Sequence, residues 1–345
     1  MKYVDIQSLL FWYEANKRDL PWRNTRDPYC IWLSEIILQQ TRVDQGLAYY
    51  YKFVEAFPRV QDLAKAHLDE VLAMWQGLGY YSRGRNLHAT ALQVTEIGGF
   101  PSTYEALLKL KGVGPYTAAA IASFAYQEQV AVLDGNVFRV LSRWLGSHLP
   151  IDAASTRNEF QALLNQWIPA DSPDIFNQSM MELGALVCTP KSPKCEECPL
   201  QNSCKANAEG NATNYPVKKT KVKVSAMALT YFELHVAGKV AFVKRRDNGI
   251  WAGLYDLPSC STEQEMTIDE IANQLCDWGV QGELEFCYET RHLLSHRKIQ
   301  ARFYKVLCEH MPSNEFQWIT LNELKVLGMS TLLKNYLEKR YTSGA

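Results

Sequence analysis

The feature that most constrains the fold is a run of four cysteines within 17 residues. They lie at Cys188, Cys195, Cys198 and Cys204, in the spacing C-x6-C-x2-C-x5-C. A cytosolic chain keeps its thiols reduced, so this run indicates a metal centre rather than a disulfide framework. Four thiolates can hold a tetrahedral zinc ion or a [4Fe–4S] cluster. Structural zinc usually draws on two C-x-x-C pairs and this run contains one, so we favour the iron–sulfur cluster.

A chain of 345 residues is long enough for two domains, and its pattern changes once, after Cys204. Up to residue 187, apolar residues recur three and four positions apart. This spacing predicts helices over residues 31–43, 68–75, 104–110, 117–126, 137–145 and 176–187. Residues 205–224 are polar and basic, which is typical of a linker. From residue 225 onward, β-rich stretches and amphipathic helices at 268–278 and 330–339 predict an α+β domain. We therefore expect domains at 1–204 and 225–345.

Charge does not decide between nucleic acid and other partners. The net charge is −1 overall, with −3 over residues 1–204, +4 over 205–224 and −2 over 225–345. No apolar run approaches the roughly 20 residues that cross a bilayer. The first residues include acids and lack a small-residue cleavage site, so they do not resemble a signal peptide. We expect a soluble protein of a bacterial-type cytoplasm, associated with the nucleoid during its work and without a membrane partner.

Residues 107–125, LLKLKGVGPYTAAAIASFA, predict two helices joined by a tight turn. The first helix should end at Lys111, the turn should comprise Gly112, Val113 and Gly114, and Pro115 should open the second helix. In such a helix–hairpin–helix, backbone N–H groups point outward and can bind a phosphate. A turn of this kind alone is more often plain packing. Its occurrence before the cysteine run favours contact with a DNA backbone.

Two carboxyl groups fit glycosidic chemistry. Glu35, in WLSEIILQQT, shares a helical face with Ile31 and Leu38, and apolar neighbours raise the pKa of a carboxyl and keep it protonated. The alternative for Glu35 is an exposed position on a helix surface. Asp134, in LDGNV, precedes a helix and is expected to cap it, which also favours the ionised form. A protonated and an ionised carboxyl together can cleave a glycosidic bond.

A further segment, GLGYYSRGRNLH at residues 77–88, interleaves aromatic residues with Arg83 and Arg85. This composition suits phosphate contact combined with stacking or wedging into a duplex. The alternative is a packed aromatic turn that carries two surface arginines.

Together these segments resemble the adenine DNA glycosylases of the MutY family, within the endonuclease III superfamily. The resemblance rests on LPWR, WLSEIILQQT, GLGYYSR, GVGPYTA, LDGNV, FNQSMMELGALVCT and the cysteine run. It extends from about Leu20 to Cys204, and more loosely beyond. It implies a mainly α N-terminal part, with a six-helix barrel and an iron–sulfur lobe. A Nudix-like (MutT-like) α+β domain follows and reads 8-oxoguanine opposite the target adenine.

The resemblance also assigns roles to residues of this chain. Those implied in catalysis are Glu35, Asp134, Tyr116 and Asn136. Those implied in contact with the flipped adenine or with the duplex around the oxidised base are Arg23, Gln40 and Tyr80. Those implied as ligands of one [4Fe–4S] cluster are Cys188, Cys195, Cys198 and Cys204. In the C-terminal domain, LSH at 294–296 resembles the FSH loop of the family, so Ser295 and His296 are expected to contact 8-oxoguanine.

Four departures from the family pattern are present, and two of them carry expectations about activity. Tyr116 stands where bifunctional relatives place a lysine, so no strong lyase activity is expected. Gln178 stands where some members use a second acid, and Leu294 replaces the phenylalanine of the FSH loop. The glutamate-rich metal helix of Nudix enzymes is missing, so no pyrophosphatase activity is expected.

The expected function is hydrolysis of adenine from duplex DNA opposite 8-oxoguanine or guanine, by a monomer that leaves an abasic site. One alternative enzyme is an endonuclease that acts on thymine glycol, and another is a mismatch thymine glycosylase. An alternative of another class is a DNA-binding scaffold without catalysis, which would not need a buried Glu35.

Overall fold

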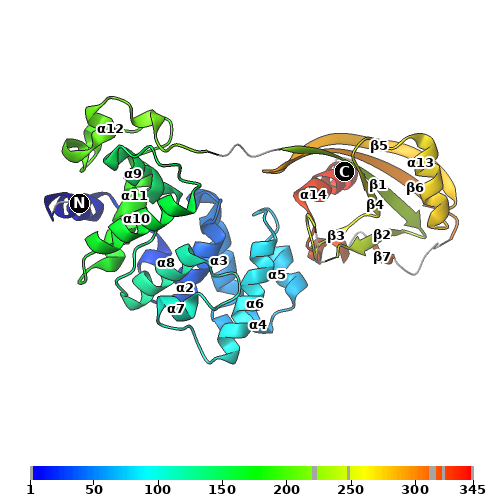
Figure 1. Ribbon diagram of the computed structural model, residues 1–345. Helices are drawn as coiled ribbons and strands as arrows, with labels where there is room; N and C mark the ends of the chain where they lie inside the picture. The colour runs from blue at the N-terminus through cyan, green and yellow to red at the C-terminus, as the bar shows by residue number, and fades with distance from the viewer. Residues whose placement is uncertain (1–2, 220–223, 247–248, 311–315, 321–322, 343–345) are drawn as a thin grey trace. The chain divides into compact units, whose positions relative to one another are not determined.

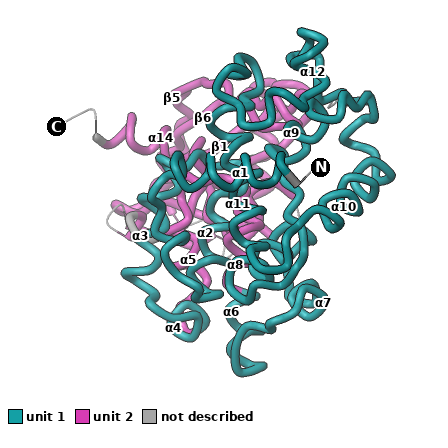
Figure 2. Tube along the Cα trace, turned by 90° about the vertical axis from the view of Figure 1, so that its left-hand side faces the viewer, with its two compact units in different colours: residues 1–64, 89–221 teal, residues 65–88, 222–345 magenta. Residues whose placement is uncertain are grey.

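The computed structural model describes residues 3–219, 224–246, 249–310, 316–320 and 323–342. The chain divides into two compact units, which are coloured separately in Figure 2. Unit 1 comprises residues 1–64 and 89–221, and unit 2 comprises residues 65–88 and 222–345. The segment 65–88, which carries GLGYYSR, thus groups with the C-terminal residues and not with the helices that flank it in sequence.

Unit 1 is built from helices throughout its described residues, and Figure 1 shows them in order along the chain. Its helices are α1 (Tyr3–Asn16), η1 (Pro21–Arg23), α2 (Pro28–Leu38), α3 (Val43–Ala56), α4 (Val60–Lys65), the end of α6 (Ser82–Glu96), α7 (Tyr104–Leu107), α8 (Pro115–Tyr126), α9 (Gly135–Leu145), α10 (Ala154–Trp167), α11 (Pro173–Leu186), η2 (Cys195–Glu197), η3 (Gln201–Ser203), α12 (Lys205–Ala208) and η4 (Ala212–Asn214).

One hydrophobic core of unit 1 joins the first helix to much later ones. Leu9 of α1, Phe138 of α9, Phe160 of α10 and Phe176 of α11 share one buried cluster. Three of the four clustered cysteines are partly buried against it. The N-terminal helix therefore belongs to the same packed body as the cysteine loop.

Two predicted helices are shorter than expected. The single helix predicted over 31–43 is wrong, because α2 ends at Leu38 and α3 begins only at Val43. Gln40, in the break, has a φ of 60°, a left-handed conformation that a helix cannot contain. The helix predicted to reach Lys111 also ends early, at Leu107, and continues as a tighter turn in which the Leu110 N–H donates to the Leu107 carbonyl.

Unit 2 is a mixed sheet with a helix on each face (Figure 1). Its elements are α5 (Leu68–Met74), the start of α6, β1 (Ser225–Val236), β2 (Lys239–Lys244), β3 (Tyr255–Asp256), β4 (Ser259–Thr262), α13 (Ile268–Asp277), β5 (Gly282–Leu293), β6 (Arg297–Cys308), β7 (Gln317–Thr320), η5 (Glu323–Val326) and α14 (Thr331–Thr342). The strand order is β3-β2-β1-β6-β5, with β4 also paired to β1 and β7 to β2. The central pair, β1 and β6, runs parallel with Tyr231 opposite Phe303.

Apolar side chains that point alternately to the two faces of β1 explain why both faces of the sheet are covered. Leu229 and Tyr231 join a core that contains Leu333 of α14. Phe232 and Leu234, of the other parity, join a core that contains Ile271 of α13. Because successive side chains of a strand point to opposite faces, one apolar strand can support a helix on each side.

The predicted linker, 205–224, contains ordered structure in its first part. Helix α12 lies within it, and Ala206 and Tyr215 are buried. The Ile151 N–H donates to the Val217 carbonyl over 3.0 Å. Residues 220–223 of this predicted linker lie outside the described residues. No helix within the described ranges is long and apolar enough to span a membrane.

Candidate active site

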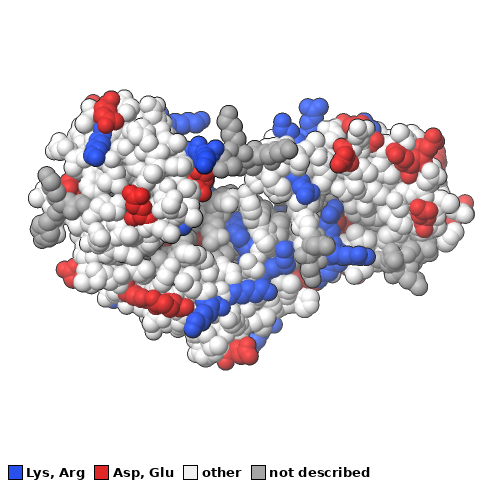
Figure 3. Space-filling view, in the orientation of Figure 1, with Lys and Arg blue, Asp and Glu red and all other residues white. Residues whose placement is uncertain are grey.

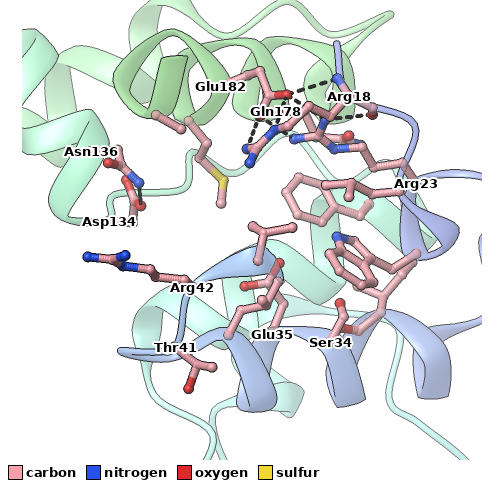
Figure 4. Close-up of a pocket in the computed structure, with 18 of the residues that line it drawn as sticks. Arg18, Arg23, Ser34, Glu35, Thr41, Arg42, Asp134, Asn136, Gln178 and Glu182 are labelled. Atoms are coloured by element: carbon pink, nitrogen blue, oxygen red, sulfur yellow. Dashed lines mark hydrogen bonds and ion pairs between the residues drawn. The ribbon is translucent and has the colours of Figure 1, made fainter. Parts of the chain in front are cut away.

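Unit 1 contains a cavity of about 500 Å³ that brings together most of the predicted catalytic residues. Its walls come from η1, α2, α8, α9 and α11 (Figure 4). Glu35, Tyr116, Asp134, Asn136 and Arg23 all line it. Residues far apart in sequence thus share one chamber. Gln40 is not among the lining residues and is exposed in the break after α2.

Glu35 is a buried acid. It is 5% exposed and lies in the middle of α2, which begins at Pro28 after the N-cap Asp27. Burial raises the pKa of Glu35 to about 7, and the charge of Asp134 adds to the rise. The Tyr116 hydroxyl donates a hydrogen bond to Glu35 Oε2, which opposes burial by favouring the carboxylate. Glu35 can therefore carry a proton near neutral pH and release it.

Asp134 caps α9 and is surrounded by N–H donors. The Val137 N–H donates to Asp134 Oδ1 over 2.7 Å, and Asn136 Nδ2 donates to Oδ2 over 2.8 Å. Burial raises the pKa of Asp134 above its ordinary value, because it outweighs the lowering by these donors and by the charge of Arg139. The pKa of Asp134 is therefore set by burial as well as by the hydrogen bonds of the helix cap. Because Asp134 receives N–H donors and Glu35 receives one hydroxyl, negative charge is better accommodated on Asp134.

Glu182 of α11 is a site residue that sequence reasoning missed. It is 1% exposed and accepts paired hydrogen bonds from both Arg18 and Arg23, the shortest at 2.6 and 2.8 Å (Figure 4). Burial raises the pKa of Glu182, but the two arginines outweigh burial and lower it to about 2. The signal was present in MMELGALV, where a lone acid interrupts an apolar helix as Glu35 does in α2.

Gln178 also lines the cavity, one helical turn before Glu182. Its side-chain carbonyl accepts a hydrogen bond of 2.7 Å from the Tyr13 hydroxyl. The acidic group that α11 presents to the cavity is therefore Glu182, while position 178 supplies an amide.

The predicted hairpin turn exposes only part of its backbone. Gly112 has a φ of 75°, and the Val113 N–H donates to the Leu110 carbonyl over 3.2 Å within the turn. Gly114 is the N-cap of α8, and Pro115 occupies the first helical position. The first N–H groups of a helix have no partner inside it. The donors available to an outside anion are therefore at Gly114 and the start of α8, while Val113 serves the turn.

The four clustered cysteines line one small hollow of unit 1. The Arg143 guanidinium donates to Cys188 Sγ over 3.3 Å. Burial raises the pKa of the Cys198 and Cys204 thiols, and backbone N–H groups that face them oppose this rise. Four thiols that line one hollow form a donor set that fits an iron–sulfur cluster.

The predicted lesion-reading residues line a second hollow, of about 720 Å³, within unit 2. Ser295 and His296 occupy the turn between β5 and β6, and the Ser295 hydroxyl lies 3.3 Å from His296 Nδ1. Tyr80 lines the same hollow, is 47% exposed and has a φ of 47°. Left-handed conformations are uncommon outside glycine and are concentrated at functional sites.

Family models match three parts of the chain. Residues 33–169 match the HhH-GPD superfamily of base excision DNA repair proteins, and residues 188–204 match the iron–sulfur binding domain of endonuclease III. Residues 230–339 match the NUDIX domain. The fold class and the iron–sulfur cofactor predicted from the sequence are therefore confirmed.

Similar whole proteins decide the family. The chain is 33% identical to the adenine DNA glycosylase of Mus musculus over 95% of its own length and 76% of the mouse protein. It is 32% identical to that of Buchnera aphidicola from Schizaphis graminum, over 99% of this chain and 92% of the relative. The chain belongs to the adenine DNA glycosylase family. Against the Arabidopsis thaliana member, which is 40% identical, it covers only 47% of the relative's length.

Solved structures agree with this adenine DNA glycosylase fold. A thermostable thymine-DNA glycosylase matches 59% of the chain and 95% of its own length, with a TM-score of 0.55 and 29% identity. Endonuclease III trapped on DNA matches 59% of the chain and 94% of its own length, with a TM-score of 0.51 and 22% identity. The predicted enzyme class, a base excision repair glycosylase that hydrolyses N-glycosidic bonds, is confirmed by the family.

Proposed function

We propose that this enzyme removes adenine paired with 8-oxoguanine, or with guanine, from duplex DNA and leaves an abasic site. One observation carries this proposal for the chemistry. Glu35, with a pKa raised to about 7, shares a cavity with Asp134, which is supplied with N–H donors. A single cavity thus holds one carboxyl suited to donate a proton and one suited to remain charged.

Glu35 is the proposed general acid. An adenine stacked inside a duplex cannot reach this cavity, so the base must be flipped out of the stack. Glu35 then gives its proton to a ring nitrogen of the adenine. The glycosidic C–N bond breaks with its electron pair going to the protonated base, which leaves as neutral adenine. A positioned acid of this kind typically contributes a factor of about 10²–10⁴.

Asp134 is the proposed partner of the positively charged sugar. Its carboxylate stabilises the oxocarbenium-like carbon, or captures it covalently as retaining glycosidases do. Water then attacks that carbon and gives a proton to the Glu35 carboxylate, which restores the acid. Asn136 Nδ2 holds Asp134 Oδ2 at 2.8 Å and thereby positions it. Because Tyr116 supplies a phenol and no amine, a Schiff-base step has no nucleophile at this position.

Arg23 is proposed to contact the flipped base from a fixed position. Its guanidinium makes two hydrogen bonds to Glu182, of 3.0 and 2.8 Å, and one of 3.1 Å to the Arg18 carbonyl. Such paired bonds fix the plane of the guanidinium. Arg23 can therefore offer a donor toward the cavity without losing its orientation.

The clustered cysteines are proposed to hold the iron–sulfur group. When bound, the group would cross-link the loop 188–204 to itself, and three of its ligands, Cys188, Cys198 and Cys204, pack against the core that Leu9 and Phe138 share. The hydrolytic steps above use only protein side chains and water.

Reading of the base opposite adenine is proposed for the hollow of unit 2. Ser295 and His296 line this hollow and are proposed to supply the polar groups, and Tyr80, which lines it too, is proposed to enter the duplex. On the face of unit 2 in Figure 3, basic side chains gather over the end with α14 and β3, and acidic ones over the end with α13. Positive charge attracts a phosphate backbone. The turn of Gly112, Val113 and Gly114 is proposed to contact phosphate through the N–H groups at Gly114 and the start of α8. Gln40 is proposed to enter the duplex.

The test is release of bases from defined duplexes. We expect adenine from A:8-oxoguanine, more slowly from A:G, and no thymine from T:G or thymine glycol from its pair with adenine. Chromatography identifies each base, and strand cleavage should need alkali because the product is an abasic site. Ser295→Ala with His296→Ala should lower the A:8-oxoguanine to A:G rate ratio about tenfold. Release of thymine, or of no base, would contradict the proposal. The monomeric state and the nucleoid location stay predictions.

A further inference from the structure

Arg143 is a buried arginine of unit 1 whose positive charge has no acidic partner among the described residues. It lies in the last turn of α9 and is 2% exposed. The arginine–carboxylate pairs within the described part of the chain involve other arginines, and none involves Arg143. A buried charge is costly unless hydrogen bonds and an opposite charge compensate it. The compensation for Arg143 must therefore come from another kind of group.

Arg143 lines the hollow of the four clustered cysteines, and within the described residues its guanidinium donates to four acceptors. Nε donates to the Tyr215 carbonyl over 3.2 Å, Nη1 to the Thr189 carbonyl over 2.7 Å, and Nη2 to the Pro190 carbonyl over 2.9 Å. The fourth acceptor is Cys188 Sγ, 3.3 Å from Nη1. The three carbonyls satisfy N–H groups but bring no countercharge. The sulfur is the one acceptor of the four that can carry negative charge.

A second arginine of α9 increases the need for negative charge at Cys188. Arg139 lies one helical turn before Arg143, is 9% exposed and donates to the Cys188 carbonyl over 2.7 Å. Like charges four positions apart on a helix repel each other. Burial lowers the pKa of Arg139, and the charge of Arg143 also acts to lower it. Two buried positive charges thus lie beside Cys188.

We propose that Arg143 is the countercation of the iron–sulfur group and the hydrogen-bond donor to its ligand Cys188. This inference rests on the proposed function, in which Cys188 is a ligand. A cluster held by four thiolates is an anion, and adding an electron makes it more negative. A fixed positive charge and an N–H donor at a ligand sulfur favour the reduced form and raise the reduction potential. Arg143 therefore makes the bound cluster harder to oxidise.

A purely structural role for Arg143 predicts the opposite shift in potential. Its bonds to the Thr189 and Pro190 carbonyls also fix the loop, and a substitution that only loosened the loop would admit water to the hollow. Water stabilises the more highly charged, reduced form and raises the reduction potential. Loss of the countercharge lowers the potential instead. The sign of the shift consequently separates the two roles.

The test is the midpoint potential of the cluster in full-length, iron-loaded protein, measured by voltammetry in the absence of DNA. We expect Arg143→Gln to change the ratio of oxidised to reduced cluster at a fixed applied potential about tenfold, which is a fall of about 59 mV for one electron. Arg143→Lys should lower the potential by less, because its ammonium keeps the charge but offers one nitrogen where the guanidinium offers three. Iron analysis and circular dichroism check that each variant is loaded and folded.

The matched control is Arg157 of α10, which is exposed and lies over the Phe138 ring, 5.1 Å from its centroid. Arg157 is not among the residues that line the hollow of the cysteines. Arg157→Gln removes the same charge from a position that solvent screens, so it should keep the parental potential.

A parental or raised potential in Arg143→Gln would overturn the inference. If that variant does not fold or does not hold iron, Arg143→Lys decides, and a parental or raised potential there would overturn the inference as well. An equal fall in Arg157→Gln would also count against it, because the effect would not depend on contact with Cys188. Four irons and a parental potential in Cys188→Ser would instead contradict the proposed ligand. The two failures are therefore distinguishable.

Discussion

The hydroxyl of Tyr116 donates a hydrogen bond to Oε2 of Glu35, and the two side chains come from different helices, α8 and α2. Burial raises the pKa of Glu35 to about 7, and this bond opposes the rise. The Tyr116 phenol therefore keeps the pKa of Glu35 close to neutral pH. Without it, the carboxyl would hold its proton more tightly and return it less readily.

The first prediction concerns the pH profile of adenine excision. Excision should slow as the pH rises through about 7, because Glu35 then loses the proton it must donate. Tyr116→Phe removes a hydrogen bond that favours the carboxylate, so the pKa of Glu35 should rise and the falling limb should move to higher pH. Single-turnover excision rates between pH 5.5 and 9 measure the falling limb of the parent and that of Tyr116→Phe. Tyr126→Phe, on the same helix, is the control, and identical limbs for Tyr116→Phe and the parent would contradict the assignment.

The second prediction concerns stability. The folded pKa of Glu35, about 7, exceeds its ordinary value of 4.5, so the folded state binds this proton more tightly. The corresponding stability is fully present below pH 4.5 and is lost as the pH rises to about 7. Glu35→Gln keeps the shape and cannot ionise, so at pH 8 it should be more stable than the parent by up to about 3 kcal/mol. Urea unfolding at pH 8 and pH 4.5 measures this, and a gain that does not depend on pH would refute it.

The third prediction concerns Glu182, whose pKa is lowered to about 2 by Arg18 and Arg23 despite burial. Its contribution to stability is present above pH 4.5 and lost as the pH falls toward 2. Glu182→Gln leaves two arginines without their countercharge and should destabilise the protein by about 2–3 kcal/mol at pH 7. We place the cost below that of a fully buried pair because Arg18 is 34% exposed.

The control for Glu182 is Glu14→Gln, which breaks an exposed pair with Lys17 and should change stability by less than about 1 kcal/mol. Unfolding is followed at pH 7 and pH 4. The Glu182 effect should shrink at the lower pH, and an effect of equal size at both would show that charge is not its cause.

Sequence reasoning reached the members of the catalytic cavity but not the arrangement behind them. Glu35 and Asp134 could be identified from the sequence because each breaks a local pattern. Glu35 is an acid on an apolar helix face, and Asp134 is a helix cap. Glu182 breaks the same pattern in α11, but its importance depends on Arg18 and Arg23, more than 150 residues earlier in sequence. Pairs at that separation follow from tertiary packing, which periodicity does not report.

For the fold, too, local features could be predicted and distant packing could not. The sequence predicted the change from helical to β-rich structure and the two helices that flank the sheet. The grouping of 65–88 with the C-terminal residues was not, because no local signal in that segment points to a distant sheet. One consequence is practical. A fragment ending at residue 224 would strip 65–88 of its packing partners, so point variants at Ser295 and His296 test the second unit more cleanly than truncation does.

The fourth prediction concerns the cysteine loop. Protein purified without oxygen should be brown and contain about four irons per chain, because four thiolates suit a cubane cluster. Cys198→Ser should lose iron and stability, since Cys198 packs partly buried against the core of unit 1. Cys260→Ser in unit 2 is the control and should keep its iron. Metal analysis decides, and stoichiometric zinc in protein made with ample iron would contradict the assignment.

The most direct test of the central claim is single-turnover adenine excision by Glu35→Gln and Asp134→Asn, on an A:8-oxoguanine duplex at pH 7. Both variants keep the size of the side chain, and one lacks the transferable proton while the other lacks the negative charge. We predict that both bind the duplex with near-parental affinity and that each loses a factor of at least about 10² in excision rate. A near-parental rate in either variant would show that the two carboxyl groups do not perform the chemistry assigned to them.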